Sequence, residues 1–292
     1  MKRNSRLAGG DLARREAEYL VLLSWERSFG TKMSKIDLYS HLSDPMPLPA
    51  QDLLLQWLEQ RAAGFPLQHI TGVQAFLEHD YNVGPEVLVP RPETEILCAT
   101  AIAELQREKV GPFLGFEIGV GSGILSIELL SRFPSLRMVA SELTRDAMEC
   151  AFKNAQRILG DDAIRTGRFT LLQSESDREV WEPFVRHSPH VLVDFLISNP
   201  PYLVPTDEID DEVLTHEPKE ALFPPQQDPL YFYRAIAKGA ERFLRPRGYI
   251  FLEIPSQRSC AISHLFSERK WNIKVHPDLT GSNRVLIGRL EG

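Results

Sequence analysis

The sequence has few cysteines and no long apolar run. Its 292 residues include three cysteines, which lie far apart and form no CxxC pair: Cys98, Cys150 and Cys260. This excludes a disulfide framework, and we assign no metal site. The apolar runs are far shorter than the ~18 residues that a membrane-spanning helix needs. No signal-peptide core follows the basic start. We therefore expect a cytoplasmic protein with no membrane partner.

The sequence also lacks an excess of positive charge. It has 33 Lys and Arg against 40 Asp and Glu, a net charge of −7. A protein that holds nucleic acid along its length needs Lys and Arg to neutralise phosphates, so this balance argues against direct nucleic-acid binding. Hydrophobic residues make up 43% of the chain and charged residues 25%, which is typical of a globular enzyme or binding protein.

The chain divides into three parts by its patterning. Residues 1–65 have apolar residues at helical spacing and no strand signal, which predicts a small helical domain. β-forming residues separated by Gly and Pro follow over 66–90 and predict a hairpin linker. From 91 to 292 helix and strand patterns alternate, which predicts an α/β domain with a mostly parallel sheet covered on both faces. The short turn between the last two strands indicates that one of them is antiparallel.

A glycine loop joins a predicted strand to a predicted helix. It reads Gly119-Val120-Gly121-Ser122-Gly123, and Ile124 stands where the dinucleotide fingerprint needs another glycine. A plain structural turn is the alternative interpretation. Glu142 ends the next strand, where an acid can hold both ribose hydroxyls of a ligand, and this favours a nucleoside site without a pyrophosphate. Glu175 and Ser176 follow the third strand, and either contact with adenine or an ordinary polar loop explains them.

A second motif, Asn199-Pro200-Pro201-Tyr202, follows the most apolar predicted strand, 191–198. The Asn199 side-chain oxygen and the Pro200 carbonyl can accept both hydrogens of a planar NH₂ group, and Tyr202 can stack on that plane. Two acceptors stabilise the positive charge that develops on such a nitrogen during methyl transfer, and no general base is needed beforehand. We therefore predict Asn199, Pro200 and Tyr202 as catalytic, all four residues as substrate-binding, and Asn199 as a further cofactor contact.

These residues resemble S-adenosylmethionine-dependent N-methyltransferases, specifically the HemK/PrmC family. The resemblance covers nearly the whole chain and is most specific at Val87 to Glu95. It implies a Rossmann-like class I fold with a seven-stranded sheet, S-adenosyl-L-methionine as cofactor, and an N-terminal domain that helps to grip a protein. It further implies methylation of N5 of a glutamine in class-1 peptide chain release factors, by an enzyme that we expect to be a monomer. The chain departs from the family in its prolines: the family usually has glycines near Pro224, Pro225 and Pro229, and Pro255 replaces a glycine after Glu253.

Two other functions are consistent with parts of the sequence. An adenine-N6 methyltransferase acting on DNA or RNA would use the same second motif, since adenine N6 is also a planar NH₂. Acidic residues crowd the segment after Tyr202, however, and would repel a phosphate backbone: Asp207, Glu208, Asp210, Asp211, Glu212, Glu217 and Glu220. A cofactor-binding module without activity is the non-enzyme alternative, and the intact second motif disfavours it.

Overall fold

The computed structural model describes residues 2–108, 113–177, 179–267 and 270–292. Contacts divide the chain into two compact units, Met1–Gly72 and Val73–Gly292. The division falls inside the linker that the sequence predicts over 66–90. In the described ranges, no helix combines the length and the apolar character that crossing a membrane requires.

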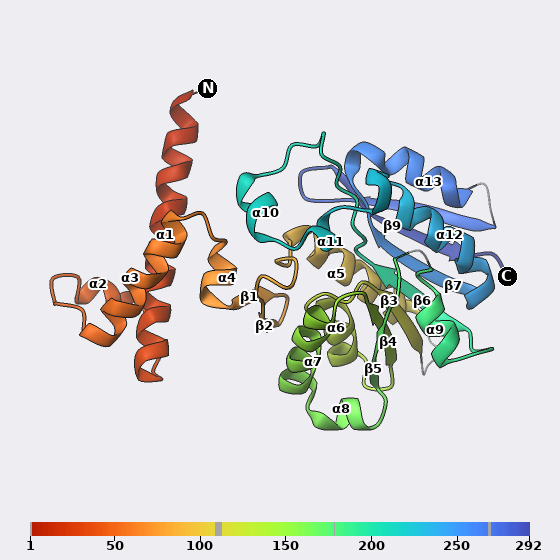
Figure 1. Ribbon diagram of the computed structural model, residues 1–292, viewed down its shortest axis with the longest axis horizontal. Coiled ribbons are helices and arrows are strands. Elements are labelled where there is room, and N and C mark those ends of the chain that lie inside the picture. Colours follow the sequence, from red (N-terminus) through yellow and green to blue (C-terminus); the bar gives the residue numbers. More distant parts are fainter. Residues whose placement is uncertain (1, 109–112, 178, 268–269) are drawn as a thin grey trace. The chain divides into compact units, whose positions relative to one another are not determined.

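The first unit is helical, as predicted (Figure 1). Its helices are α1 (Lys2–Phe29), α2 (Lys35–Ser40), α3 (Leu48–Ala62) and α4 (Leu67–Thr71). Ser34 caps α2 in a reciprocal capping box with Asp37. The Arg61 guanidinium lies 3.2 Å from the Glu16 carboxylate and joins α3 to α1. Pro49 lies in the first turn of α3, where its missing N–H is no loss.

The second unit opens with the hairpin that the sequence predicts. Strands β1 (Val73–Phe76) and β2 (His79–Asn82) pair antiparallel. The segment before them is α4, a short helix that the sequence pattern does not reveal. Helix α4 ends at Gly72, whose φ of +72° is a left-handed conformation that glycine adopts readily.

A seven-stranded sheet forms the centre of the second unit, in the order β5-β4-β3-β6-β7-β9-β8. Strands β3 to β7 run parallel to their neighbours, while β9 is antiparallel to both β7 and β8. This confirms the mostly parallel sheet and the antiparallel end. The strands are β3 (Leu114–Ile118), β4 (Arg137–Glu142), β5 (Phe169–Gln173), β6 (Val193–Ser198), β7 (Leu244–Glu253), β8 (Trp271–Pro277) and β9 (Asn283–Leu290).

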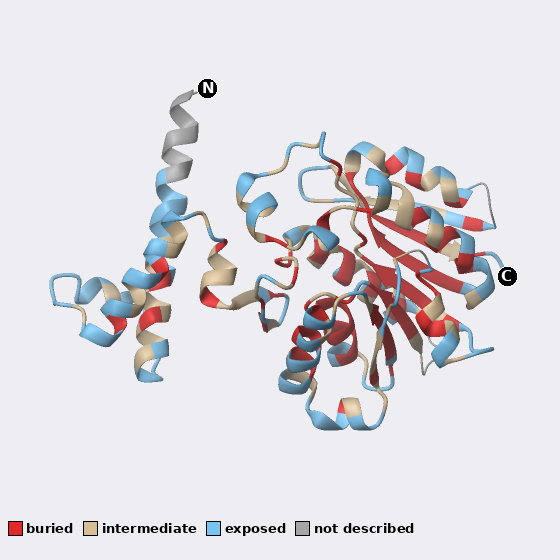
Figure 2. Cartoon of the chain, in the orientation of Figure 1, coloured by how far each residue is buried: buried red, intermediate tan, exposed pale blue. Residues whose placement is uncertain are grey.

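Helices cover both faces of this sheet. One apolar cluster joins α5 (Pro92–Arg107), α6 (Ile124–Arg132) and α7 (Arg145–Leu159) to the strands. The other joins α9 (Glu182–His187), α12 (Tyr231–Phe243) and α13 (Ser259–Ser267) to the opposite face. Strand β6 serves both clusters, because Phe195 and Ile197 face one and Leu196 faces the other. Figure 2 shows these buried strands between more exposed helices. Shorter helices lie in the connections: α8 (Asp161–Arg165), α10 (Asp211–His216) and α11 (Lys219–Leu222).

Candidate active site

The two motifs meet at the carboxyl ends of three neighbouring strands. Glu142 ends β4, the glycine loop follows β3, and Asn199 follows β6, and these strands are adjacent in the sheet. The Ser198 hydroxyl donates to the Ile118 carbonyl oxygen at 2.7 Å and ties the ends of β6 and β3 together. Ligands of open α/β sheets bind at this edge. The topology therefore brings residues that are about 80 positions apart in the chain into one site.

One cavity at this edge is lined by most of the predicted site residues: Gly119, Val120, Gly121, Ser122, Glu142, Ser176, Asn199, Pro200 and Pro201. Gly123, Glu175 and Tyr202 do not line it. Polar side chains outside the two motifs also line it: Thr94, Glu117, Asp177 and Glu220, the last from the acidic segment after Tyr202. The cavity thus joins the predicted cofactor and substrate motifs, and its walls carry further acids besides Glu142.

The three glycines of the loop have different roles. Their φ angles are +75° at Gly119, +52° at Gly121 and +87° at Gly123, a region that L side chains rarely adopt. A Cβ at Gly119 or Gly121 would meet nothing within 4 Å, so these two leave open space beside the cavity. A Cβ at Gly123 would lie 2.8 Å from Ile127 Cδ1 and 3.3 Å from Ala151 Cα. Gly123 therefore allows α6 to pack against α7 and is not placed to touch a ligand.

Glu142 is held by backbone groups on both sides of the site. Its Oε2 accepts from the Gly121 N–H at 3.0 Å, which links the acid directly to the glycine loop. Its Oε1 accepts from Leu143 N at 2.7 Å and Thr144 N at 3.2 Å, at the start of α7. The carboxylate is thus fixed at the cavity wall before any ligand arrives, and it keeps acceptor capacity for a hydroxyl.

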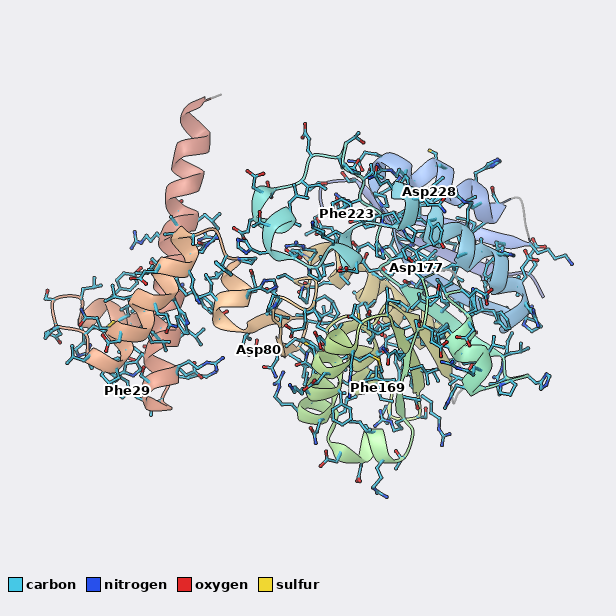
Figure 3. The ribbon with its side chains drawn as sticks, in the orientation of Figure 1. Phe29, Asp80, Phe169, Asp177, Phe223 and Asp228 are labelled. Carbon is cyan, nitrogen blue, oxygen red and sulfur yellow. The ribbon has the colours of Figure 1, made fainter. Side chains whose placement is uncertain are left out.

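The loop after β5 places a different acid in the cavity from the one that the sequence analysis names. Glu175 is exposed and pairs with Arg186 at 2.5 Å. Ser176 and Asp177 line the cavity instead, and Figure 3 labels Asp177 in the connection between β5 and α9. The position of an acid after the third strand is a signal present in the sequence. Which acid of the loop turns inward depends on its packing.

Glu117 is a buried acid at the base of the cavity. It lies in β3 with 1% of its surface exposed, and it accepts hydrogen bonds from the backbone N–H and the hydroxyl of Ser126. Burial raises the pKa of Glu117 to about 8, against the lowering effect of these two bonds. In the sequence, Glu117 has no signal of its own, because it lies within an otherwise apolar strand.

Asn199 is oriented by a chain of hydrogen bonds across three elements. Its Nδ2 donates to Thr94 Oγ1 at 3.2 Å, and Thr94 Oγ1 donates to Glu253 Oε2 at 2.7 Å. Thr94 lies in the first turn of α5, and Glu253 ends β7, the strand next to β6. Both are 2% exposed. With its NH₂ group committed to Thr94, Asn199 presents its oxygen elsewhere, as an acceptor for a ligand.

Tyr202 packs beside the cavity and does not line it. Its ring packs against the second apolar cluster, beside the strands and not at the cavity wall. Its hydroxyl interacts with the carboxyl group of Glu253. Burial raises the pKa of the Tyr202 phenol. In this arrangement Tyr202 supports the residues behind Asn199. Stacking of Tyr202 on a substrate group stays a prediction.

Two acids of the segment after Tyr202 are neutralised by arginines. Glu217 is buried and accepts from Arg91 at 2.5 Å and from Val89 N at 3.2 Å, so Arg91 is its ion-pair partner. Asp207 pairs with Arg258 at 2.7 Å. Burial raises the pKa of Glu217, and the Arg91 charge opposes that rise. The segment is therefore less negative than its composition indicates, although Glu220 still lines the cavity.

In the described ranges no group of three or more His, Cys, Asp or Glu could hold a metal ion.

Comparisons with known proteins agree with this geometry. Residues 4–72 match the family described as the PrmC N-terminal domain. The chain is 32% identical over 289 residues to the release factor glutamine methyltransferase of Moorella thermoacetica, covering 97% of this chain and 94% of that protein. It is 31% identical over 261 residues to the bifunctional methyltransferase of Rickettsia felis, covering 79% of this chain and 46% of that protein. A methyltransferase structure from Pyrococcus furiosus shares the fold, with a TM-score of 0.53 at 18% identity over 80% of this chain and 100% of that one.

Proposed function

Because this chain belongs to the release factor glutamine methyltransferase family, we propose that it methylates a glutamine side-chain amide of a class-1 peptide chain release factor. The methyl donor is S-adenosyl-L-methionine. One observation supports the assignment most strongly: the Asn199-Pro200 motif and the glycine loop with Glu142 line the same cavity. An acceptor pair for an NH₂ group therefore lies beside a site suited to a nucleoside.

The residues of the cavity fit this cofactor. The open space beside Gly119 and Gly121 lets a ligand approach bare backbone. Glu142 offers a fixed carboxylate for a ribose hydroxyl, and Ser176 and Asp177 supply polar groups in the loop after β5. When bound, S-adenosylmethionine supplies an electrophilic methyl group. In our proposal, Gly119, Gly121 and Glu142 hold it in place.

Asn199 and Pro200 act on the target nitrogen. An amide nitrogen is a poor nucleophile because its lone pair is delocalised into the carbonyl group. The Asn199 oxygen accepts one hydrogen of the substrate amide, and the Pro200 carbonyl accepts the other. These bonds strengthen as positive charge develops on the nitrogen, so they stabilise the transition state more than the bound substrate. The nitrogen then loses a proton after methyl transfer.

The test is a transfer assay with defined acceptors. The purified chain is incubated with methyl-labelled S-adenosylmethionine and a purified class-1 release factor, and the modified residue is mapped by mass spectrometry. Replacement of the mapped glutamine by asparagine should abolish labelling, because the shorter side chain cannot reach the acceptor pair. Parallel reactions contain DNA or RNA in place of the release factor. Label in nucleic acid, with none in the release factor, would establish the adenine-N6 alternative and overturn this proposal.

The proposal extends to the oligomeric state of the enzyme and to its cellular compartment. We place it in the cytoplasm, where release factors act, as a monomer that binds protein and makes no direct contact with nucleic acid. The net charge of −7 and the presence of Glu220 at the cavity support a protein substrate over a phosphate backbone. Analytical ultracentrifugation at the assay concentration measures the oligomeric state. A dimer at that concentration would refute the proposal that the enzyme is a monomer.

A further inference from the structure

The polarity of the hydrogen-bond chain behind Asn199 carries information about catalysis. An asparagine amide has nearly the same shape after a flip that exchanges Oδ1 and Nδ2, so shape alone does not decide which atom faces a substrate. If Nδ2 faced the substrate, a donor would oppose the hydrogens of the target NH₂ group. Something in the site must therefore select the orientation in which Oδ1 is available.

Thr94 makes that selection only because of Glu253. A threonine hydroxyl has one hydrogen to donate, and an ionised carboxylate can only accept. Thr94 gives its hydrogen to Glu253 Oε2 at 2.7 Å, so only a lone pair of Oγ1 remains for Asn199. That lone pair accepts from Nδ2 at 3.2 Å. The orientation of the Asn199 amide thus follows from the charge state of a residue two hydrogen bonds away.

We propose that Thr94 and Glu253 are positioning residues, which hold the Asn199 amide with its oxygen toward the nitrogen that is methylated. This inference rests on the proposed function of the cavity. Both residues are buried, and their contacts lie within the second compact unit. The hydrogen bonds from Asn199 to Thr94 and from Thr94 to Glu253 are therefore formed before the substrate binds. Glu253 also polarises the chain, which makes the Asn199 oxygen a better acceptor for a developing cation.

Protonation of Glu253 would reverse the donor-to-acceptor direction of these hydrogen bonds. A neutral carboxyl can donate to Thr94 Oγ1, which frees the threonine hydrogen for Asn199 Oδ1 and favours the flipped amide. Burial raises the pKa of Glu253 to about 7, where this change would be visible in kinetics. Other groups act on this carboxyl: Glu93, the Tyr202 hydroxyl, and Arg284 with its partner Asp278. The Tyr233 hydroxyl donates instead to the backbone carbonyl oxygen of Glu253. The proposal therefore expects kcat to rise with pH through the titration of Glu253.

Substitutions at Thr94 test the positioning role. In Thr94→Val, kcat should fall about 10- to 100-fold, as misorientation of a reacting group typically causes. The Kd of S-adenosylmethionine should change little. Thr94→Ser keeps the hydroxyl and should retain most of the wild-type kcat. Thr100→Val, a half-buried threonine of the same helix outside the cavity, is the matched control and should behave as wild type. A kcat for Thr94→Val within about twofold of wild type would overturn the proposal, and so would a Thr94→Ser as impaired as Thr94→Val.

Glu253→Gln gives an independent reading. Glutamine can turn either its oxygen or its NH₂ group toward Thr94, so kcat should fall. Because a glutamine side chain does not titrate, the rise in kcat near pH 7 should disappear. A rise that persists in Glu253→Gln contradicts the proposal, even if Thr94→Val fails to fold. The ¹⁵N signal of the Asn199 side chain, measured without substrate, should shift in Thr94→Val but not in Thr100→Val. An unchanged signal refutes the positioning, whereas a wild-type enzyme that methylates no release factor refutes only the proposed function.

Discussion

Replacing Glu142 by glutamine should weaken binding of S-adenosylmethionine while leaving the shape of the site nearly intact. In the wild type both carboxylate oxygens accept: Oε2 from Gly121 N at 3.0 Å, and Oε1 from Leu143 N and Thr144 N at 2.7 and 3.2 Å. A glutamine has one oxygen and one NH₂ group. Whichever way it turns, its NH₂ group must oppose a backbone N–H, either in the glycine loop or at the start of α7.

The size of the effect follows from this count. An ionised carboxylate has about four lone-pair sites. Three of them accept from backbone N–H groups, which leaves about one for a ribose hydroxyl. A donor left without a partner costs about 1–3 kcal/mol. If this cost falls on the loop that binds the cofactor, the Kd should rise about 5- to 150-fold. The loss should appear in binding more than in kcat at saturating cofactor.

Calorimetry on the purified variants measures this Kd directly. Thermal unfolding of the ligand-free protein separates a loss of binding from a loss of folding. Glu149→Gln, an exposed acid on α7 that pairs with Lys153, is the matched control and should leave the Kd unchanged. If Glu142→Gln binds S-adenosylmethionine as tightly as wild type does, the assignment of Glu142 to the ribose is wrong.

Three further predictions follow from the same geometry. Asn199→Ala should lower kcat about 10²- to 10³-fold in the transfer assay, and a decrease under about twofold would contradict its role. Gly123→Ala should destabilise the fold by about 2 kcal/mol, from strain at positive φ and contact with Ile127. Gly119→Ala has the same strain at positive φ but no such contact, so it should destabilise the fold less and also reduce cofactor affinity, and denaturant unfolding with calorimetry distinguishes the two variants. Glu117 keeps its proton in the folded state to about pH 8 but loses it near 4.5 when unfolded. Stability of the ligand-free protein should therefore fall as pH rises between these values, and Glu117→Gln should flatten that slope.

The sequence by itself determines the local parts of the site. A run such as 193–198 is apolar on both faces, which specifies a strand buried between two helical layers. The glycine loop needs three left-handed backbone positions within five residues, and glycine is the residue that supplies them. The Pro200-Pro201 pair restricts φ directly after β6, which is also a local effect. Such features depend on residues that are close in the chain, so they are visible without coordinates.

Only the tertiary structure decides which side chains turn into the cavity. Glu175 and Asp177 are chemically alike and two positions apart, yet one pairs with Arg186 and the other lines the site. Tyr202 packs into an apolar cluster whose other members come from helices and strands elsewhere in the chain. These choices depend on which space the neighbouring elements leave open, and no local pattern encodes that space.

The orientation of Asn199 is the clearest case of a property that only the tertiary structure decides. Asn199 is visible in the sequence as part of its motif, but Thr94 lies 105 positions before it, and Glu253 is 159 positions after Thr94. The pairing of β6 with β7 and the packing of α5 across the sheet bring the three together. A hydrogen bond needs a contact of about 3 Å between specific atoms, and only the folded chain sets that distance across such separations. The sequence thus determines which groups are available, and the packing of distant elements determines which way the catalytic amide points.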